Sequence, residues 1–181
     1  MSKPMLALIG VGGALVVILA WWFIPTGSHG QSGPSDFELA QQARQKAVDL
    51  LSTKGARVTE KTYPIGKAYA VNLSGQTITP ELLDQLKSLG HVSELDLSKS
   101  TVTDDLLGKM SQLGLTNTMA VLDLSNTGVS DEGLNRLENM IYLFRINLAG
   151  TKCTKAGVDK FKRNREAQVN TKTRNPTIKL N

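Results

Sequence analysis

The sequence predicts an α/β solenoid of about four strand–turn–helix repeats, with an N-terminal helical cap and one transmembrane helix. Three observations carry this prediction: leucine columns that share one irregular spacing, hydroxyl residues at equivalent helix starts, and a long uncharged run near the N-terminus. Self-similarity with a period of roughly 20 to 50 residues is typical of repeat architectures.

Four segments of the chain align with one another, beginning at Ala70, Glu94, Val121 and Arg145. Their central leucines are separated by 24, 27 and 24 residues, and two further apolar columns keep the same intervals. Independent amphipathic pieces would not preserve such an offset, so the units are repeats. The central leucines are Leu73, Leu97, Leu124 and Leu148.

Each repeat reads as a short strand, a turn and a helix. Leu95 and Leu97 alternate with Asp96, which is the two-residue period of a strand. A Ser or Thr then stands where its hydroxyl accepts from an unpaired helical N–H, and Pro80 occupies a first helical position. The predicted N-caps are Thr79, Thr103, Ser130 and Thr154. The inward strand residues, predicted to fill the core, are Val71, Leu73, Leu95, Leu97, Leu122, Leu124, Ile146 and Leu148.

The pattern of these units resembles leucine-rich repeats of the cysteine-containing type, in particular short bacterial versions with LDLSxTxVTDxGL units. The resemblance covers about half the chain and implies a concave parallel sheet with helices on the convex side. Family repeats often carry Asn or Cys at a turn position that bonds neighbouring coils. This chain has Gln76, Ser100, Thr127 and Thr151 there, so we expect hydroxyls to make most of any such ladder.

The predicted organisation has five parts. Residues 1–25 form a transmembrane anchor or a signal peptide, 26–35 a flexible linker and 36–67 an N-terminal cap. Residues 68–170 form the repeat domain, and 171–181 a basic disordered tail.

Met5 to Ile24 is an uncharged run long enough to cross a hydrocarbon layer of about 30 Å. Trp21 and Trp22 end it, which favours an anchor over a cleaved signal peptide, whose apolar region is about 7 to 15 residues. The expected location is therefore a membrane, single-pass, with the repeat domain on the exported side.

Outward strand positions predict a protein-binding face on the sheet. Strands lie about 4.8 Å apart, so Asp96 and Asp123 should be neighbours. Two such carboxylates either raise the pKa of one of them or hold a cation, or else they are hydrated, bond nearby Ser hydroxyls and present a polar surface to a partner. The solvated interpretation is favoured. The predicted binding residues are Asn72, Glu94, Asp96, Asp123, Arg145 and Asn147.

The charge distribution and the cysteine and histidine content limit the kinds of function that we expect for this chain. The net charge is +5, but the residues from Lys152 onward carry +7, which leaves −2 on the rest. The basic C-terminal segment could contact an anionic partner. Nucleic acid is not expected, because this segment lacks aromatic residues between its basic residues on which bases could stack. Cys153 falls in an inward column and is predicted to be a core residue. His29 and His91 have no nearby residues in the sequence with which they could form a catalytic arrangement, and no phosphate-binding loop or zinc-binding motif occurs. We therefore expect no enzymatic activity, metal or cofactor.

The expected function is a non-catalytic, membrane-tethered module that binds proteins through its repeat surface. The alternative is an accessory or assembly subunit of a larger membrane complex, with Met5 to Ile24 packed against other helices.

Overall fold

A computed structural model describes residues 34–64, 66–168 and 175–180 of the chain. The helices of these residues are α1 (Asp36–Thr53), α2 (Pro80–Ser88), α3 (Asp104–Gln112), α4 (Asp131–Asn135) and α5 (Lys155–Gln168), with the 3-10 turn η1 (Leu115–Asn117). The strands are β1 (Arg57–Tyr63), β2 (Gly66–Asn72), β3 (Val92–Asp96), β4 (Val121–Asp123), β5 (Arg145–Asn147) and β6 (Thr177–Lys179).

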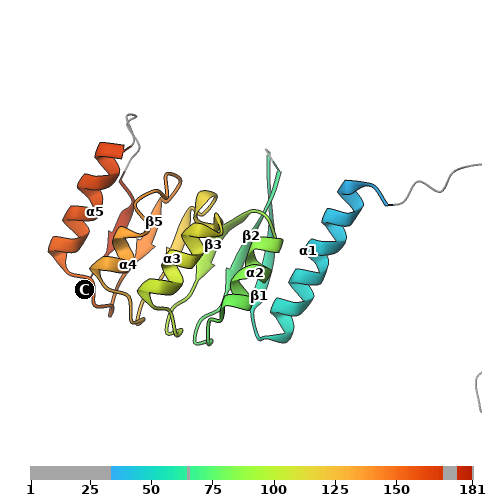
Figure 1. The fold of residues 1–181 in the computed structure, drawn as a ribbon, viewed down its shortest axis with the longest axis horizontal. Coiled ribbons are helices and arrows are strands. Elements are labelled where there is room, and N and C mark those ends of the chain that lie inside the picture. The colour runs from blue at the N-terminus through green and yellow to red at the C-terminus, as the bar shows by residue number, and fades with distance from the viewer. Residues whose placement is uncertain (1–33, 65, 169–174, 181) are drawn as a thin grey trace, which may run out of the picture. The chain divides into compact units, whose positions relative to one another are not determined.

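All six of these strands belong to one sheet, in chain order from β1 to β6. β1 pairs antiparallel with β2, and every later pair is parallel. Helices connect the parallel strands, and each helix contacts the next, from α1 to α5 (Figure 1). A parallel pair needs a crossover between its strands, and the helices of the repeats supply it.

The core lies between the sheet and these helices. All eight predicted inward residues are buried, and Leu97 and Leu124 are 0% exposed. Helix residues close the core from the other side, among them Leu83, Leu107, Leu134 and Phe161. Because every unit shares apolar neighbours with the next, one contiguous cluster runs through the domain.

The predicted N-caps are confirmed. Thr79 accepts a hydrogen bond from the N–H of Leu82, and Thr103, Ser130 and Thr154 accept equivalent bonds at the starts of α3, α4 and α5. Each hydroxyl satisfies a donor that the helix itself leaves unpaired.

The turn hydroxyls behave differently from the expected ladder. Ser100 donates to the carbonyl of Leu97 at 2.5 Å, three residues earlier in the same unit. Thr127 and Thr151 donate in the same way to Leu124 and Leu148, both at 2.6 Å. These bonds therefore close each turn on its own strand and do not join neighbouring units.

The predicted fold class is corrected by this structure. The described residues form an α/β domain on one mostly parallel six-stranded sheet, and they do not show the predicted four-repeat solenoid with a transmembrane helix. Two strands outside the aligned repeats complete the sheet: antiparallel β1 at one edge and β6 at the other. The repeat pattern could not reveal β1, because antiparallel backbone pairing adds it to the sheet without a share in the periodicity, and β6 lies beyond the last of the four aligned units.

The predicted transmembrane helix and single-pass location are also corrected. Among the described residues, no helix is both long enough and apolar enough to span a membrane. α1 has 18 residues, but charges such as Arg44, Lys46 and Asp49 interrupt its apolar positions. The segment that carried the prediction, Met5 to Ile24, lies outside the described residues, as does most of the predicted linker.

Candidate functional site

The face of the sheet away from the helices carries a shallow hollow of about 630 Å³, which we call the sheet groove. Only strand residues line it: Arg57, Thr59, Ala70, Val71, Asn72, Glu94, Leu95, Asp96, Val121, Leu122, Asp123, Arg145, Ile146, Asn147, Thr177 and Lys179. All six predicted binding residues are among them. That they bind a protein stays a prediction.

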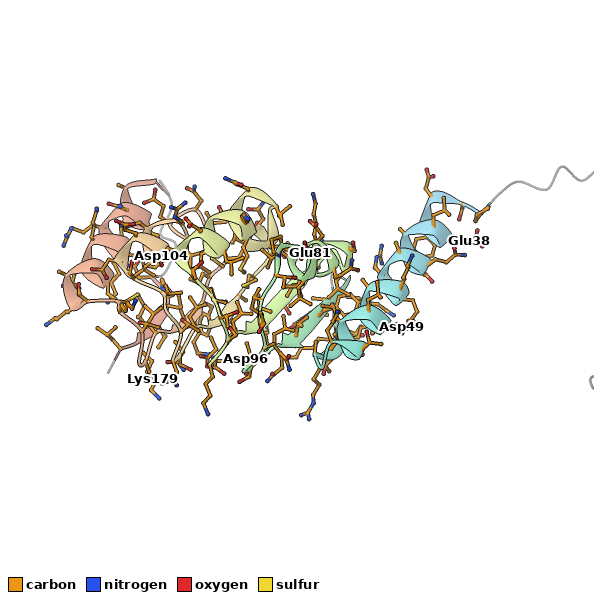
Figure 2. The ribbon with its side chains drawn as sticks, turned by 60° about the horizontal axis from the view of Figure 1, so that its bottom comes forward. Glu38, Asp49, Glu81, Asp96, Asp104 and Lys179 are labelled. Atoms are coloured by element: carbon orange, nitrogen blue, oxygen red, sulfur yellow. The ribbon has the colours of Figure 1, made fainter. Side chains whose placement is uncertain are left out.

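One row of polar side chains crosses the groove, with one residue from each strand. The strand registers place its six members side by side in the order Arg57, Asn72, Asp96, Asp123, Asn147 and Lys179. The row is basic at both ends, carries amides next, and has two carboxylates in the middle. Asp96 and Lys179 accordingly lie on the same side of the domain in Figure 2.

Hydrogen bonds hold the middle of this row in place. Asn72 donates its Nδ2 to Asp96 Oδ2 at 2.8 Å, and Asn147 donates to Asp123 Oδ2 at 2.9 Å. The other carboxylate oxygens accept the N–H two residues later, from Ser98 at 2.9 Å and from Ser125 at 2.8 Å. Such short local bonds fix the side-chain rotamers.

Asp123 stays ionised in this setting. Partial burial acts to raise its pKa, but hydrogen bonds from Ser125 and Asn147 and the charge of Lys179 outweigh it, so the pKa lies below its usual value. This finding opposes the raised pKa that two adjacent carboxylates could produce. Within the described part of the chain, no three His, Cys, Asp or Glu residues are grouped so that they could hold a metal ion.

A second row, nearer the strand starts, contains Thr59, Ala70, Glu94, Val121 and Arg145. Glu94, one of the predicted binding residues, forms an ion pair with Lys61 at 2.6 Å.

The hydrogen bond to Glu94 is the main reason why the pKa of Lys61 lies above its usual value. Lys61 reaches Glu94 across β2, where Ala68 and Ala70 leave room for its side chain. Glu94 therefore offers a partner less negative charge than the sequence suggests.

Sequence reasoning missed two basic members of the groove. Arg57 was assigned to the cap, and Lys179 to the disordered tail. A signal for Lys179 existed: Thr177–Ile178–Lys179–Leu180 repeats the alternation of Arg145–Ile146–Asn147–Leu148, with which β6 pairs in register.

The remaining candidates do not join this site. Cys153 is half-buried against the core, as predicted, and burial raises the pKa of its thiol. His91 is exposed between α2 and β3, and His29 lies outside the described residues. His91 does not line the sheet groove.

The loop between α4 and β5, which precedes Arg145 of the groove in the chain, carries exposed apolar side chains. Tyr142 is 63% and Phe144 56% exposed, and Ile141 is also exposed. Adjacent exposed side chains of this size are characteristic of interaction surfaces.

Comparison of the chain with protein-family models and with curated proteins found no match. The resemblance to leucine-rich repeats therefore stays a prediction.

Proposed function

We propose that this chain is a non-catalytic module that binds another protein through the sheet groove. The observation that carries the proposal is the six-residue row from Arg57 to Lys179, whose central groups are held by their own hydrogen bonds on an open face. A surface that is already ordered loses little conformational entropy on binding, which favours recognition.

The exposed apolar side chains of the loop between α4 and β5 support the same proposal. Aromatic residues and arginine dominate the energetics of many protein interfaces. Here Tyr142 and Phe144 are exposed and precede Arg145 of the groove in the chain, so we propose that a partner in the groove also contacts them.

The basic tail and the sheet groove are not two separate candidate binding surfaces. Because Lys179 of the tail lines the groove, truncation after Arg165 would remove β6 and alter the groove itself. Single substitutions therefore test the groove more specifically than truncation does.

Site-specific photocrosslinking in the native cell tests the proposal. A crosslinking residue at Val121, in the middle of the groove, should give protein adducts of defined mass that disappear in the Asp96→Ala/Asp123→Ala double variant. The matched control position is Lys109, exposed on α3. Adducts that are identical at both positions, or that survive the double substitution in a folded variant, would contradict binding through the groove.

A further inference from the structure

We propose that the sheet groove recognises an extended peptide segment that crosses the strands and carries acidic, basic and acidic side chains in that order, over about eight residues. This inference rests on the proposed function and names the chemistry of the partner.

The charge order of the groove is the first argument. Arg57 and Lys179 stand at the two ends of the row, and Asp96 and Asp123 at its centre. None of the ion pairs found among the described residues uses any of these four side chains. A bound segment with the complementary order places opposite charges along its whole length, whereas the reverse order places like charges together.

The acceptor capacity of the central carboxylates is the second argument. An ionised carboxylate offers about four lone-pair sites. Asp96 uses two of them within the protein, and Asp123 uses three, because Ser125 Oγ also donates to it at 2.6 Å. Three acceptor sites therefore remain, which matches the three donors of a lysine ammonium.

The same hydrogen bonds orient these carboxylates before a partner arrives. Both side chains are anchored at each oxygen, so a partner cation meets charges that are already in position. This feature favours one cationic side chain at the centre of the segment over several scattered ones.

Strand spacing sets the length of the segment. The row crosses six strands, and five intervals of about 4.8 Å give about 24 Å between Arg57 and Lys179. An extended chain advances about 3.3 Å per residue, so the two acidic residues should be about seven positions apart. The basic residue then lies about midway, over the pair of aspartates.

The β5–β6 end of the groove is the more basic one. Arg145 stands two residues before Asn147 on β5 and lines the groove beside Thr177 of β6. Its charge adds to that of Lys179, so the acid that lies here contributes more than the acid near Arg57.

Selection from a displayed library of random twelve-residue peptides, on the intact protein, tests the inference. Enriched peptides should share the acidic–basic–acidic order, with successive charges about three to four positions apart. Their affinity should fall about three- to tenfold in Arg57→Glu and in Lys179→Glu, and further in Arg57→Glu/Lys179→Glu. Lys160→Glu, on the exposed side of α5, makes the same charge change outside the groove and should leave affinity unchanged.

A charge swap distinguishes recognition from general attraction. A peptide whose terminal acid is replaced by Lys should bind Arg57→Glu or Lys179→Glu better than it binds the unmodified protein. Circular dichroism and thermal unfolding of each variant show that it is folded.

The possible failures are distinguishable. Peptides that depend on Asp96 and Asp123 but carry another charge order would overturn this inference and leave the proposed function standing. Enrichment of no peptide that depends on any groove residue would overturn both.

Discussion

Two pairs of aspartates, each with the same 27-residue separation, have opposite roles in this domain. Asp96 and Asp123 lie on the sheet face, and Asp104 and Asp131 lie at the starts of α3 and α4. Figure 2 shows Asp96 and Asp104 on opposite sides of the domain. The sheet-side pair keeps free acceptor sites toward the groove, whereas the helix-side pair bonds the next unit.

The helix-side carboxylates tie successive units together. Asp104 accepts from the N–H and the hydroxyl of Ser130 at 2.9 and 2.5 Å. Asp131 accepts from the N–H and the hydroxyl of Thr154, both at 2.7 Å. Each aspartate thus anchors the residue that caps the following helix.

A glycine lies against each of these carboxylates. A Cβ added to Gly133 would collide with the carboxylate of Asp104, and one added to Gly157 would collide with that of Asp131. The helix of the next unit can approach only because it has no side chain there. The comparison teaches that a repeated acid can be structural or available, depending on whether it anchors the capping residue of the next helix or keeps acceptor sites toward the groove.

The largest effect is expected from removal of the core beneath both pairs. Leu124→Ala should lower the free energy of unfolding by about 2–5 kcal/mol, because the side chain is fully buried. Urea denaturation measures this, with Leu39→Ala on α1 as the matched control, since Leu39 is 49% exposed. Equal losses in the two variants would contradict the assigned core.

The next largest effect separates the two pairs of aspartates. Asp104→Ala should cost about 1–3 kcal/mol, because the donors of Ser130 lose their partner. Asp96→Ala should cost less, about 0.5–1 kcal/mol, since solvent can replace its bonds. If denaturation ranks these variants in the reverse order, the division of roles between the pairs is wrong.

A substitution at Gly133 tests the close approach of α4 to the Asp104 carboxylate, because the approach reverses the sign of the expected change in stability. Gly→Ala within a helix normally stabilises by up to about 1 kcal/mol. Gly133→Ala should instead destabilise by about 1–2 kcal/mol, because the new methyl group displaces the Asp104 carboxylate. In the Asp104→Ala background the same change should be neutral or stabilising. An additive double-mutant cycle would show that the two residues do not interact.

The smallest effect is the pH dependence contributed by Asp123. Its pKa is lowered in the folded state, so its contribution to stability is present above the ordinary value of about 3.9 and is lost as the pH falls through the folded pKa. The stability difference between the protein and Asp123→Asn should therefore shrink below about pH 4. A difference that stays constant from pH 7 to pH 2 would show that the carboxylate is not favoured by folding.

The groove was predictable at its centre, but Arg57 at one end was not. Asn72, Asp96, Asp123 and Asn147 repeat at one position of the aligned units, so the alternation of each strand assigns them to one face. Arg57 belongs to no repeat, and its place depends on antiparallel pairing of β1 with β2.

The pairing of Glu94 shows a further limit. Glu94 follows from the repeat pattern as an outward residue, but Lys61 is 33 positions earlier and has no counterpart in the other units. Their contact depends on the β1–β2 hairpin and on the small side chains of Ala68 and Ala70.

Arg165 was beyond sequence reasoning for a similar reason. It is 2% exposed, donates to the carbonyl of Met140 and stacks over the ring of Phe161, with a distance of 5.5 Å to the centroid. In the sequence it is one of many basic residues near the C-terminus. Only the packing of α5 against the preceding unit takes it out of solvent.

By itself, the sequence determined the parts of the domain that recur: the buried leucine columns, the capping hydroxyls and the alternating outward positions. Periodicity is a local property, because the sequence of each unit indicates a strand and a helix without reference to the other units. The tertiary structure decided the parts that occur once. It placed β1 and β6 at the edges of the sheet, and so Arg57 and Lys179 at the ends of the groove. Such edge strands are selected by backbone hydrogen bonds and by the packing of partly buried residues such as Ile178 against the core, and both depend on neighbours far away in the chain.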